Sequence, residues 1–233
     1  MQTQTISASP ARHVEPRPLP AAHPMAPAGD HPLAAALRLH GAEMRFSRNM
    51  EIFGESEAAE YFYQVVTGAV RTYKVMQDGR RQIGAFYLPG DVFGLEAGER
   101  HGFSAEAIVD STVRVVRRST IVALASRDGA LAADLWALTA GGLRLAQEHM
   151  LLLGRKSAEE RVATFLLNMA ERKPAAEVVE LPMSRQDIAD YLGLTIETVS
   201  RTLTQLEDKA AIELPTSRRI RLRSRANLQR LNG

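Results

Sequence analysis

The sequence predicts an α+β protein, because its residue pattern changes character twice along the chain. Between about residues 42 and 119, short apolar runs alternate with turn residues, which is typical of antiparallel β-structure. Between 128 and about 153 the apolar period becomes helical. Between 187 and 206, two short amphipathic stretches meet at Gly193 with barely a turn between them. We therefore expect a β-roll, then a long helix, then a helix-turn-helix.

Length and composition are those of a soluble globular protein. The chain has 233 residues, of which 45% are apolar and 24% charged. No apolar run approaches the roughly 18 residues of a membrane span, and the N-terminus, MQTQTISASPARH, lacks the apolar core of a signal peptide. There is no cysteine, which excludes disulfides and thiolate-held iron–sulfur clusters in this chain. We expect a cytoplasmic protein with no membrane partner.

Residues 1–29 are predicted to form a disordered tail. They hold six of the eleven prolines and show little apolar periodicity. His13, His23 and His31 lie within or beside this segment, but their spacing fits no metal-binding motif, so solvated histidines are the better interpretation. We expect neither a bound metal nor a cofactor.

Residues 30–126 are predicted to form an antiparallel roll or barrel. Asp78-Gly79 stands between two apolar runs and is a strong signal for a hairpin. The predicted strands are YFYQVV (61–66), AVRTYKVM (69–76), RQIGAFYL (81–88), SAEAIV (104–109) and STVRVV (111–116).

Residues 127–157 are predicted to form a long helix that joins two copies of the chain. A heptad-like seam follows steps of three and four residues. The helix is also apolar off this seam, at Trp136, Leu143, Met150 and Leu151. Such a helix can pack on its own domain with one side and on a second copy with the other, although an ordinary core helix remains the alternative. The predicted dimer seam consists of Leu135, Leu138, Gly142, Leu145, His149 and Leu152.

Residues 158–233 are predicted to contain a helix-turn-helix with a small strand pair beside it. A helix within 154–173 ends before Pro174, and Ser184 begins a plausible capping box. Gly193 supplies the turn between the next two helices, and Thr195 can cap the second one. Residues 211–222 are predicted to form two short strands around a turn. The expected shared core is Ile188, Leu192, Leu194, Val199, Leu203 and Leu206, and the expected free face is Ile196, Glu197, Ser200, Arg201 and Thr204.

Two interpretations fit the charged residues on that free face. Glu197 and Arg201 could form a surface ion pair, worth only about 0.2–0.5 kcal/mol. Alternatively the helix enters a major groove, where Arg suits the two acceptors of guanine and Glu suits the amino group of cytosine. From Leu214 to the end the chain carries six arginines and no acid, which favours a polyanionic partner. We favour double-stranded DNA, with phosphate-contact candidates at Ser184, Thr195, Arg218 and Arg219. Arg185 and Gln186 are further DNA-binding candidates.

The chain resembles the Crp/Fnr superfamily of bacterial transcription regulators, and the FixK-type, Fnr-like branch most closely. The resemblance runs from about residue 40 to 225 and is carried by VVTGAVRTYKVMQDGRRQIGAFYLPGDVFG (65–94), LLLGRKSAEERVATFLLNMAERK (151–173) and MSRQDIADYLGLTIETVSRTL (183–203). It implies a roll like the cyclic-nucleotide-binding jelly roll, a dimerisation helix and a C-terminal winged helix-turn-helix.

The resemblance also implies a function. The E-x-x-S-R pattern of the Fnr-like branch is present as Glu197, Ser200 and Arg201, which implies a homodimer that reads TTGAT-type palindromes. Ile196 replaces the Arg that the cyclic-AMP-binding members carry, which argues against their site preference. The family further implies an activator that works with RNA polymerase, here in oxygen-responsive, microaerobic gene control.

The roll is expected to work without an effector. Members that bind cyclic AMP carry Gly-Glu and later Arg-Ser, which align here with Gly90-Asp91 and Phe103-Ser104. Phe103 thus replaces a cation, and Arg100 is out of register to substitute for it. The N-terminal cysteines of oxygen-sensing members are absent too. The alternative is an effector-dependent regulator with an unidentified ligand in the roll. An enzyme is not expected, because cupin-like metal chemistry needs clustered His and carboxylate ligands and the strand region, residues 42–119, offers only His101 as a histidine.

Overall fold

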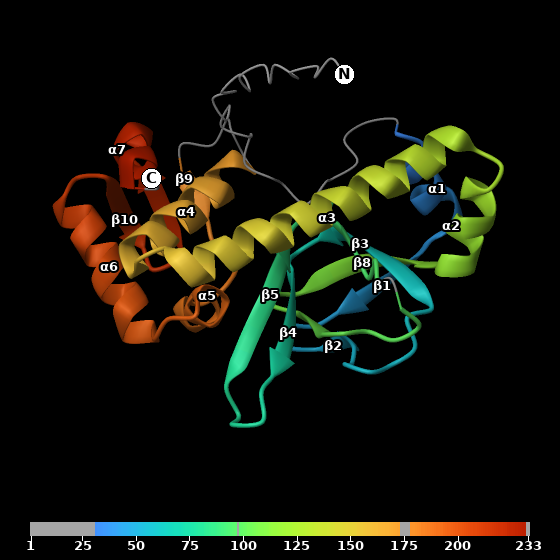
Figure 1. The fold of residues 1–233 in the computed structure, drawn as a ribbon, viewed down its shortest axis with the longest axis horizontal. Coiled ribbons are helices and arrows are strands. Elements are labelled where there is room, and N and C mark those ends of the chain that lie inside the picture. The colour runs from blue at the N-terminus through green and yellow to red at the C-terminus, as the bar shows by residue number, and fades with distance from the viewer. Residues whose placement is uncertain (1–30, 97, 173–177, 232–233) are drawn as a thin grey trace, which may run out of the picture.

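The computed structural model describes residues 31–96, 98–172 and 178–231 (Figure 1). The predicted disordered tail, residues 1–29, lies outside the described residues. Among the helices in the described part of the chain, none is long and apolar enough to cross a membrane.

The predicted β-roll is confirmed. Two antiparallel sheets face each other, with strand orders β1-β8-β3-β6 and β2-β7-β4-β5. Aromatic side chains fill the space between them, among them Phe53, Tyr63 and Phe93. The strands are β1 (Ala42–Phe46), β2 (Glu51–Phe53), β3 (Tyr61–Thr67), β4 (Val70–Val75), β5 (Arg81–Tyr87), β6 (Val92–Phe93), β7 (Ser104–Ala107) and β8 (Ser111–Arg117).

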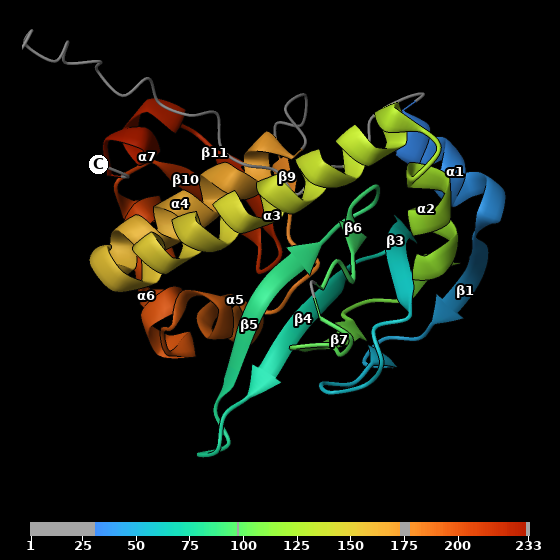
Figure 2. The same cartoon turned by 45° about the vertical axis from the view of Figure 1, so that its right-hand side comes forward.

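The predicted hairpin at Asp78-Gly79 joins β4 to β5. Gly79 has a φ of 81°, in the left-handed region that favours glycine, and the Met76 amide donates to the Arg80 carbonyl across the turn. The hairpin projects from the roll, and β5 runs close to the C-terminal domain (Figures 1 and 2).

Two short helices that the sequence analysis did not predict close one end of the roll. They are α1 (Pro32–His40) and α2 (Arg118–Ala125). Leu33 and Leu37 from α1 pack with Ile121 from α2 in one apolar cluster. This cluster supports the start of the long helix that follows.

The long helix α3 (Gly129–Arg155) runs along the molecule from α1 and α2 at one end to the C-terminal domain at the other (Figure 1). The Asp128 side chain caps its start by accepting from the amides of Ala130 and Leu131. It is followed by α4 (Ala158–Glu171), which begins with a capping box formed by Ser157 and Glu160.

The predicted winged helix-turn-helix is also confirmed. Helices α5 (Arg185–Leu192) and α6 (Ile196–Asp208) meet at Gly193, whose φ of 61° forms the left-handed cap of α5. The wing has three strands rather than two, because β9 joins the predicted pair; at three residues it is too short to give a pattern. The remaining elements are β9 (Val178–Glu180), β10 (Ile212–Thr216), β11 (Arg219–Leu222) and α7 (Arg225–Leu231).

Part of the seam predicted for dimerisation packs within the chain itself. Leu138 packs in the cluster with α1 and α2, and Leu152 packs in the cluster of the C-terminal domain. The ring of His149 stacks on Tyr191 of α5, with 4.2 Å between centroids. Leu135 and Leu145 are half-buried, and Gly142 is exposed.

The other apolar side of α3 is the exposed one. Trp136 is 75% exposed, Leu143 62%, Met150 64% and Leu151 58%. Heptad spacing identifies an apolar stripe without saying which of two stripes meets the helix's own domain, so the six-residue dimer seam stays a prediction.

Candidate nucleic-acid interface

Helix α6 separates its apolar and polar side chains cleanly. Val199, Leu203 and Leu206 are buried. The polar face predicted from helical spacing is largely solvent-facing: Glu197, Arg201 and Thr204 are exposed, and Ile196 is 37% exposed. Four of the five predicted face residues can therefore meet a partner directly.

Glu197 sits in the first turn of α6, where it is held charged. Hydrogen bonds from its own backbone amide and from the Thr195 hydroxyl lower the pKa of its carboxyl, and the positive charge of Arg201 lowers it further. Thr195 also caps the helix as predicted, since its side chain accepts from the Thr198 amide at 3.2 Å. In the described chain no ion pair within 4.0 Å joins Glu197 to Arg201, so neither group is occupied by the other, although Glu197 already accepts from its own amide and from Thr195.

Ser200, the fifth face residue, is half-buried and bonded to the neighbouring helix. Arg185, at the start of α5, donates from Nη1 to the Ser200 hydroxyl at 3.2 Å. Gln186 is exposed and donates to Asp190 Oδ1 at 2.7 Å. Arg185 therefore braces the two helices against each other, a role that the sequence did not indicate.

Ser184 forms the predicted capping box of α5. Its hydroxyl donates to Asp187 Oδ2 at 2.8 Å and accepts from the Asp187 amide at 3.1 Å. The hydroxyl thus has a donor and an acceptor partner within the chain. Its phosphate contact, like that of Thr195, stays a prediction.

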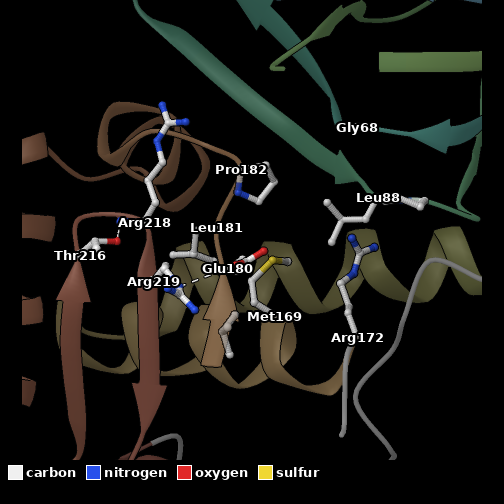
Figure 3. A pocket seen from close by; sticks show the side chains of 12 residues that line it. Gly68, Leu88, Met169, Arg172, Glu180, Leu181, Pro182, Thr216, Arg218 and Arg219 are labelled. Atoms are coloured by element: carbon white, nitrogen blue, oxygen red, sulfur yellow. Dashed lines mark hydrogen bonds and ion pairs between the residues drawn. The ribbon is translucent and has the colours of Figure 1, made fainter. Parts of the chain in front are cut away.

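The wing arginines border a cavity between the two domains (Figure 3). Arg219 lies 3.7 Å from Glu180, and Arg218 is exposed at the turn between β10 and β11. The cavity measures about 430 Å³ and is lined on the roll side by Leu88 and Pro89. The two wing cations are accessible, as a phosphate contact requires.

A cluster of charged residues joins the roll to α5, and the sequence analysis missed it. Arg71 of β4 donates to Asp187 at 2.6 Å and to Glu106 of β7 at 2.9 Å. Arg81 of β5 donates to Asp187 at 2.7 Å and to Asp190 at 2.8 Å. We call Arg71, Arg81, Glu106, Asp187 and Asp190 the roll–helix ion cluster. Its bonded members are up to 116 residues apart in sequence, so local patterns give no signal of it.

Comparison with known proteins identifies the chain. A family model described as the Crp-like helix-turn-helix domain matches residues 160–231, and one described as the cyclic nucleotide-binding domain matches residues 43–128. The nitrogen fixation regulation protein FixK of Azorhizobium caulinodans is 51% identical, over 98% of this chain and 99% of the relative. The chain belongs to the Crp/Fnr family of transcription regulators.

Further matches place it with FixK-type activators of that family. FixK of Rhizobium meliloti is 46% identical over 73% of this chain and 77% of the relative. The structure of FixK2 from Bradyrhizobium japonicum has a TM-score of 0.80 and 57% identity, covering 83% of this chain and 98% of that one. This Crp/Fnr protein is therefore a DNA-binding transcription regulator and not an enzyme.

The roll of this Crp/Fnr protein uses the aligned cassette positions for internal contacts. The Asp91 carboxylate accepts from Arg172 after α4 at 2.8 Å and from the Leu88 amide at 2.7 Å. Burial raises the pKa of Asp91 to about 6, and the Arg172 guanidinium opposes that rise. The Ser104 hydroxyl accepts from the Glu55 amide at 2.9 Å.

Phe103 packs on the backbone of β5. A Cβ at Gly84 would lie only 3.0 Å from the Phe103 ring, while 38% of Phe103 remains exposed. His101, the histidine of the roll, is 2% exposed and stacks on Phe53 at 3.6 Å between centroids. In the described residues no group of three or more His, Cys, Asp or Glu side chains could hold a metal ion.

Proposed function

We propose that this regulator activates transcription by binding TTGAT-type palindromes as a homodimer, without a small-molecule effector. The observation that carries the proposal is the polar face of α6, where Glu197 and Arg201 are exposed and not paired within 4.0 Å in the described chain. Glu197 accepts from cytosine and Arg201 donates to guanine, with Ser200 beside them. The setting is microaerobic gene control in the cytoplasm, with RNA polymerase as the partner of the bound dimer.

The test is binding of the purified protein, without added ligand, to a TTGAT-palindrome duplex. A duplex of the same composition with scrambled half-sites is the control. We expect the palindrome to bind at least about 10³-fold tighter at physiological salt, because base contacts add to phosphate contacts only on the correct sequence. Equal affinity for the two duplexes would contradict the proposal.

The exposed stripe of α3 supports the homodimer. Trp136, Leu143 and Met150 recur every seven residues and are all more than 60% exposed. A seven-residue apolar repeat is the spacing with which two helices pack side by side. A second copy of the chain therefore covers this stripe. On the opposite side of α3, Leu138 and Leu152 of the predicted seam pack the helix onto its own chain.

The stripe predicts which substitution separates the two copies. Leu143→Glu places two like charges in an apolar interface, and we expect a monomer in sedimentation with much weaker palindrome binding. Met50→Glu, which adds the same charge at a 50% exposed methionine between β1 and β2, is the control and should remain dimeric. A dimeric Leu143→Glu protein would show that the stripe is not the interface.

Internal bonding of the cassette positions supports independence from cyclic nucleotides. Asp91 is bonded to Arg172, Ser104 to a backbone amide, and Phe103 offers no cation to a phosphate. We expect cyclic AMP at millimolar concentration to change neither DNA affinity nor melting temperature. A ligand at 100 times its dissociation constant would stabilise the fold by about 2.7 kcal/mol, so a saturable melting shift with cyclic AMP would overturn this part.

A further inference from the structure

The roll–helix ion cluster is the main polar contact between the two domains, and it is buried. The side chain of Arg71 is 8% exposed and that of Asp187 is 5% exposed. Arg81 and Asp190 lie nearer the edge, with side-chain exposures of 25% and 12%. Buried ion pairs hold only when their geometry is good, because each charge has lost its water.

An apolar layer surrounds the ion cluster. Tyr191 of α5 contacts the ring of Phe86 on β5 at 5.3 Å and that of Phe165 on α4 at 5.9 Å, measured between centroids. Its backbone carbonyl accepts from Gln82 of β5 at 3.3 Å. Apolar packing is non-directional, whereas charged hydrogen bonds fix the angle at which two elements meet.

The contact leaves the base-reading side free. The ion cluster engages α5, while Glu197, Arg201 and Thr204 on α6 stay exposed. The helix-turn-helix can therefore contact the roll and DNA at the same time, and the ion cluster does not block access of DNA to α6.

We propose that Arg71 and Arg81 are positioning residues that fix the orientation of the helix-turn-helix on the roll, and thereby set the half-site spacing that the dimer accepts without a ligand. A dimer reads half-sites about 34 Å apart, and each added base pair turns one half-site by about 34°. A domain held at a fixed angle cannot follow that rotation. The inference rests on the proposed palindrome-binding dimer.

The experiment measures affinity for a series of palindromes that carry one or two added or removed base pairs between the half-sites. Arg81→Gln and Asp190→Asn break the edge pair from its two sides without burying a new charge. Arg81→Lys retains the cation as the matched control. A duplex with a single half-site tests whether α6 still reads bases, and thermal melting tests whether each variant is folded.

We expect wild type and Arg81→Lys to prefer one spacing. Arg81→Gln and Asp190→Asn should each reduce that preference by about tenfold, with single-half-site affinity unchanged. Both variants break the Arg81–Asp190 pair, and Arg81→Gln also removes the contact of Arg81 with Asp187, so the double variant should lose little more than Arg81→Gln alone. If one single variant fails to fold, the other still decides the outcome.

Two results would overturn the inference. One is an unchanged spacing preference in the neutral variants. The other is a loss of single-half-site affinity as large as the loss on the palindrome, since Arg81 would then only support the local fold. A wild-type protein with no palindrome preference would instead refute the proposed function itself.

Discussion

The two helices of the helix-turn-helix carry acidic and basic groups at similar density but use them in opposite ways. On α5, Asp187 and Asp190 bond to arginines of the roll. On α6, Glu197 and Arg201 are exposed and remain unpaired with each other within 4.0 Å, among the residues described. The charged groups of α5 therefore hold the domain on the roll, whereas those of α6 are available for the proposed contact with DNA, although the two helices are joined at Gly193.

Removing an arginine from the roll–helix ion cluster should have the largest effect on stability. Arg71→Ala leaves Glu106 without its buried cation and Asp187 with Arg81 as its only arginine partner, so we expect a loss of about 3–5 kcal/mol in the free energy of unfolding, measured by urea denaturation. Arg80→Ala is the control, because its ion pair with Asp78 is exposed and worth at most about 1 kcal/mol. Similar losses of unfolding free energy in the two variants would show that the buried ion pairs of Arg71 contribute no more than the exposed pair of Arg80.

Removing a side chain from the exposed face of α6 should leave the free energy of unfolding unchanged and alter DNA recognition. We expect Arg201→Ala to weaken binding to the correct duplex by about 1–3 kcal/mol per half-site, while binding to scrambled duplex changes little. The urea midpoint should match that of the wild type. If both duplexes lose affinity equally, Arg201 contacts phosphate and not bases.

The contact between α3 and α5 should make the stability of the protein sensitive to acid, because His149 of α3 is buried against Tyr191 of α5. Burial against Tyr191 and, to a smaller extent, the charge of Arg161 together lower the pKa of His149 to about 4. Between pH 6.5 and 4 the unfolded chain binds a proton that the folded chain refuses, so stability falls as the pH falls through this window. The loss is on the order of 1–3 kcal/mol per protomer.

His149→Phe keeps the stacking and removes the titration, so this variant should lose less stability than the wild type on going from pH 7 to pH 4.5. Asp91 acts in the opposite sense, because its pKa is raised to about 6 in the fold. Its contribution is common to both proteins and cancels in the comparison. Parallel profiles for the two proteins would argue against a role of His149 in acid sensitivity.

The smallest effect should come from the wing. Arg218→Ala removes an exposed cation, so we expect binding to all sequences to weaken alike and the salt dependence to flatten by roughly one unit of slope per lost phosphate contact. The measurement is affinity for specific and scrambled duplexes over a salt series. A loss of affinity confined to the palindromic duplex would show that Arg218 contacts bases and not phosphates.

Sequence patterns predicted those features that depend on neighbours within about ten residues. The hairpin at Asp78-Gly79, the caps at Ser184 and Thr195 and the apolar side of α6 all follow from local geometry and are present. Strands of two or three residues, such as β6 and β9, carry no period and were missed.

Contacts between elements distant in the sequence could not be predicted from local patterns. Both sides of α3 are apolar, and only the packed fold decides that Leu138 and Leu152 are inside and Leu143 is outside. Likewise Asp187 could be identified as a cap, but its partner Arg71 lies 116 residues away. The exposed face of α6 was easier to predict than the ion pairs between α5 and the roll, because a free face follows from one helix alone.

Asp187 performs two tasks with one carboxylate. Oδ2 accepts from the amide and hydroxyl of Ser184 and caps α5, while Oδ1 accepts from Arg71 and Arg81. A mutation at this position therefore changes helix initiation and domain orientation together, whereas a mutation at Arg71 leaves the α5 cap in place and removes contacts with Asp187 and Glu106. In the evolutionary record, substitutions at 71, 81 and 190 are expected to arise as compensating sets, with position 187 varying least because each alternative must satisfy both tasks.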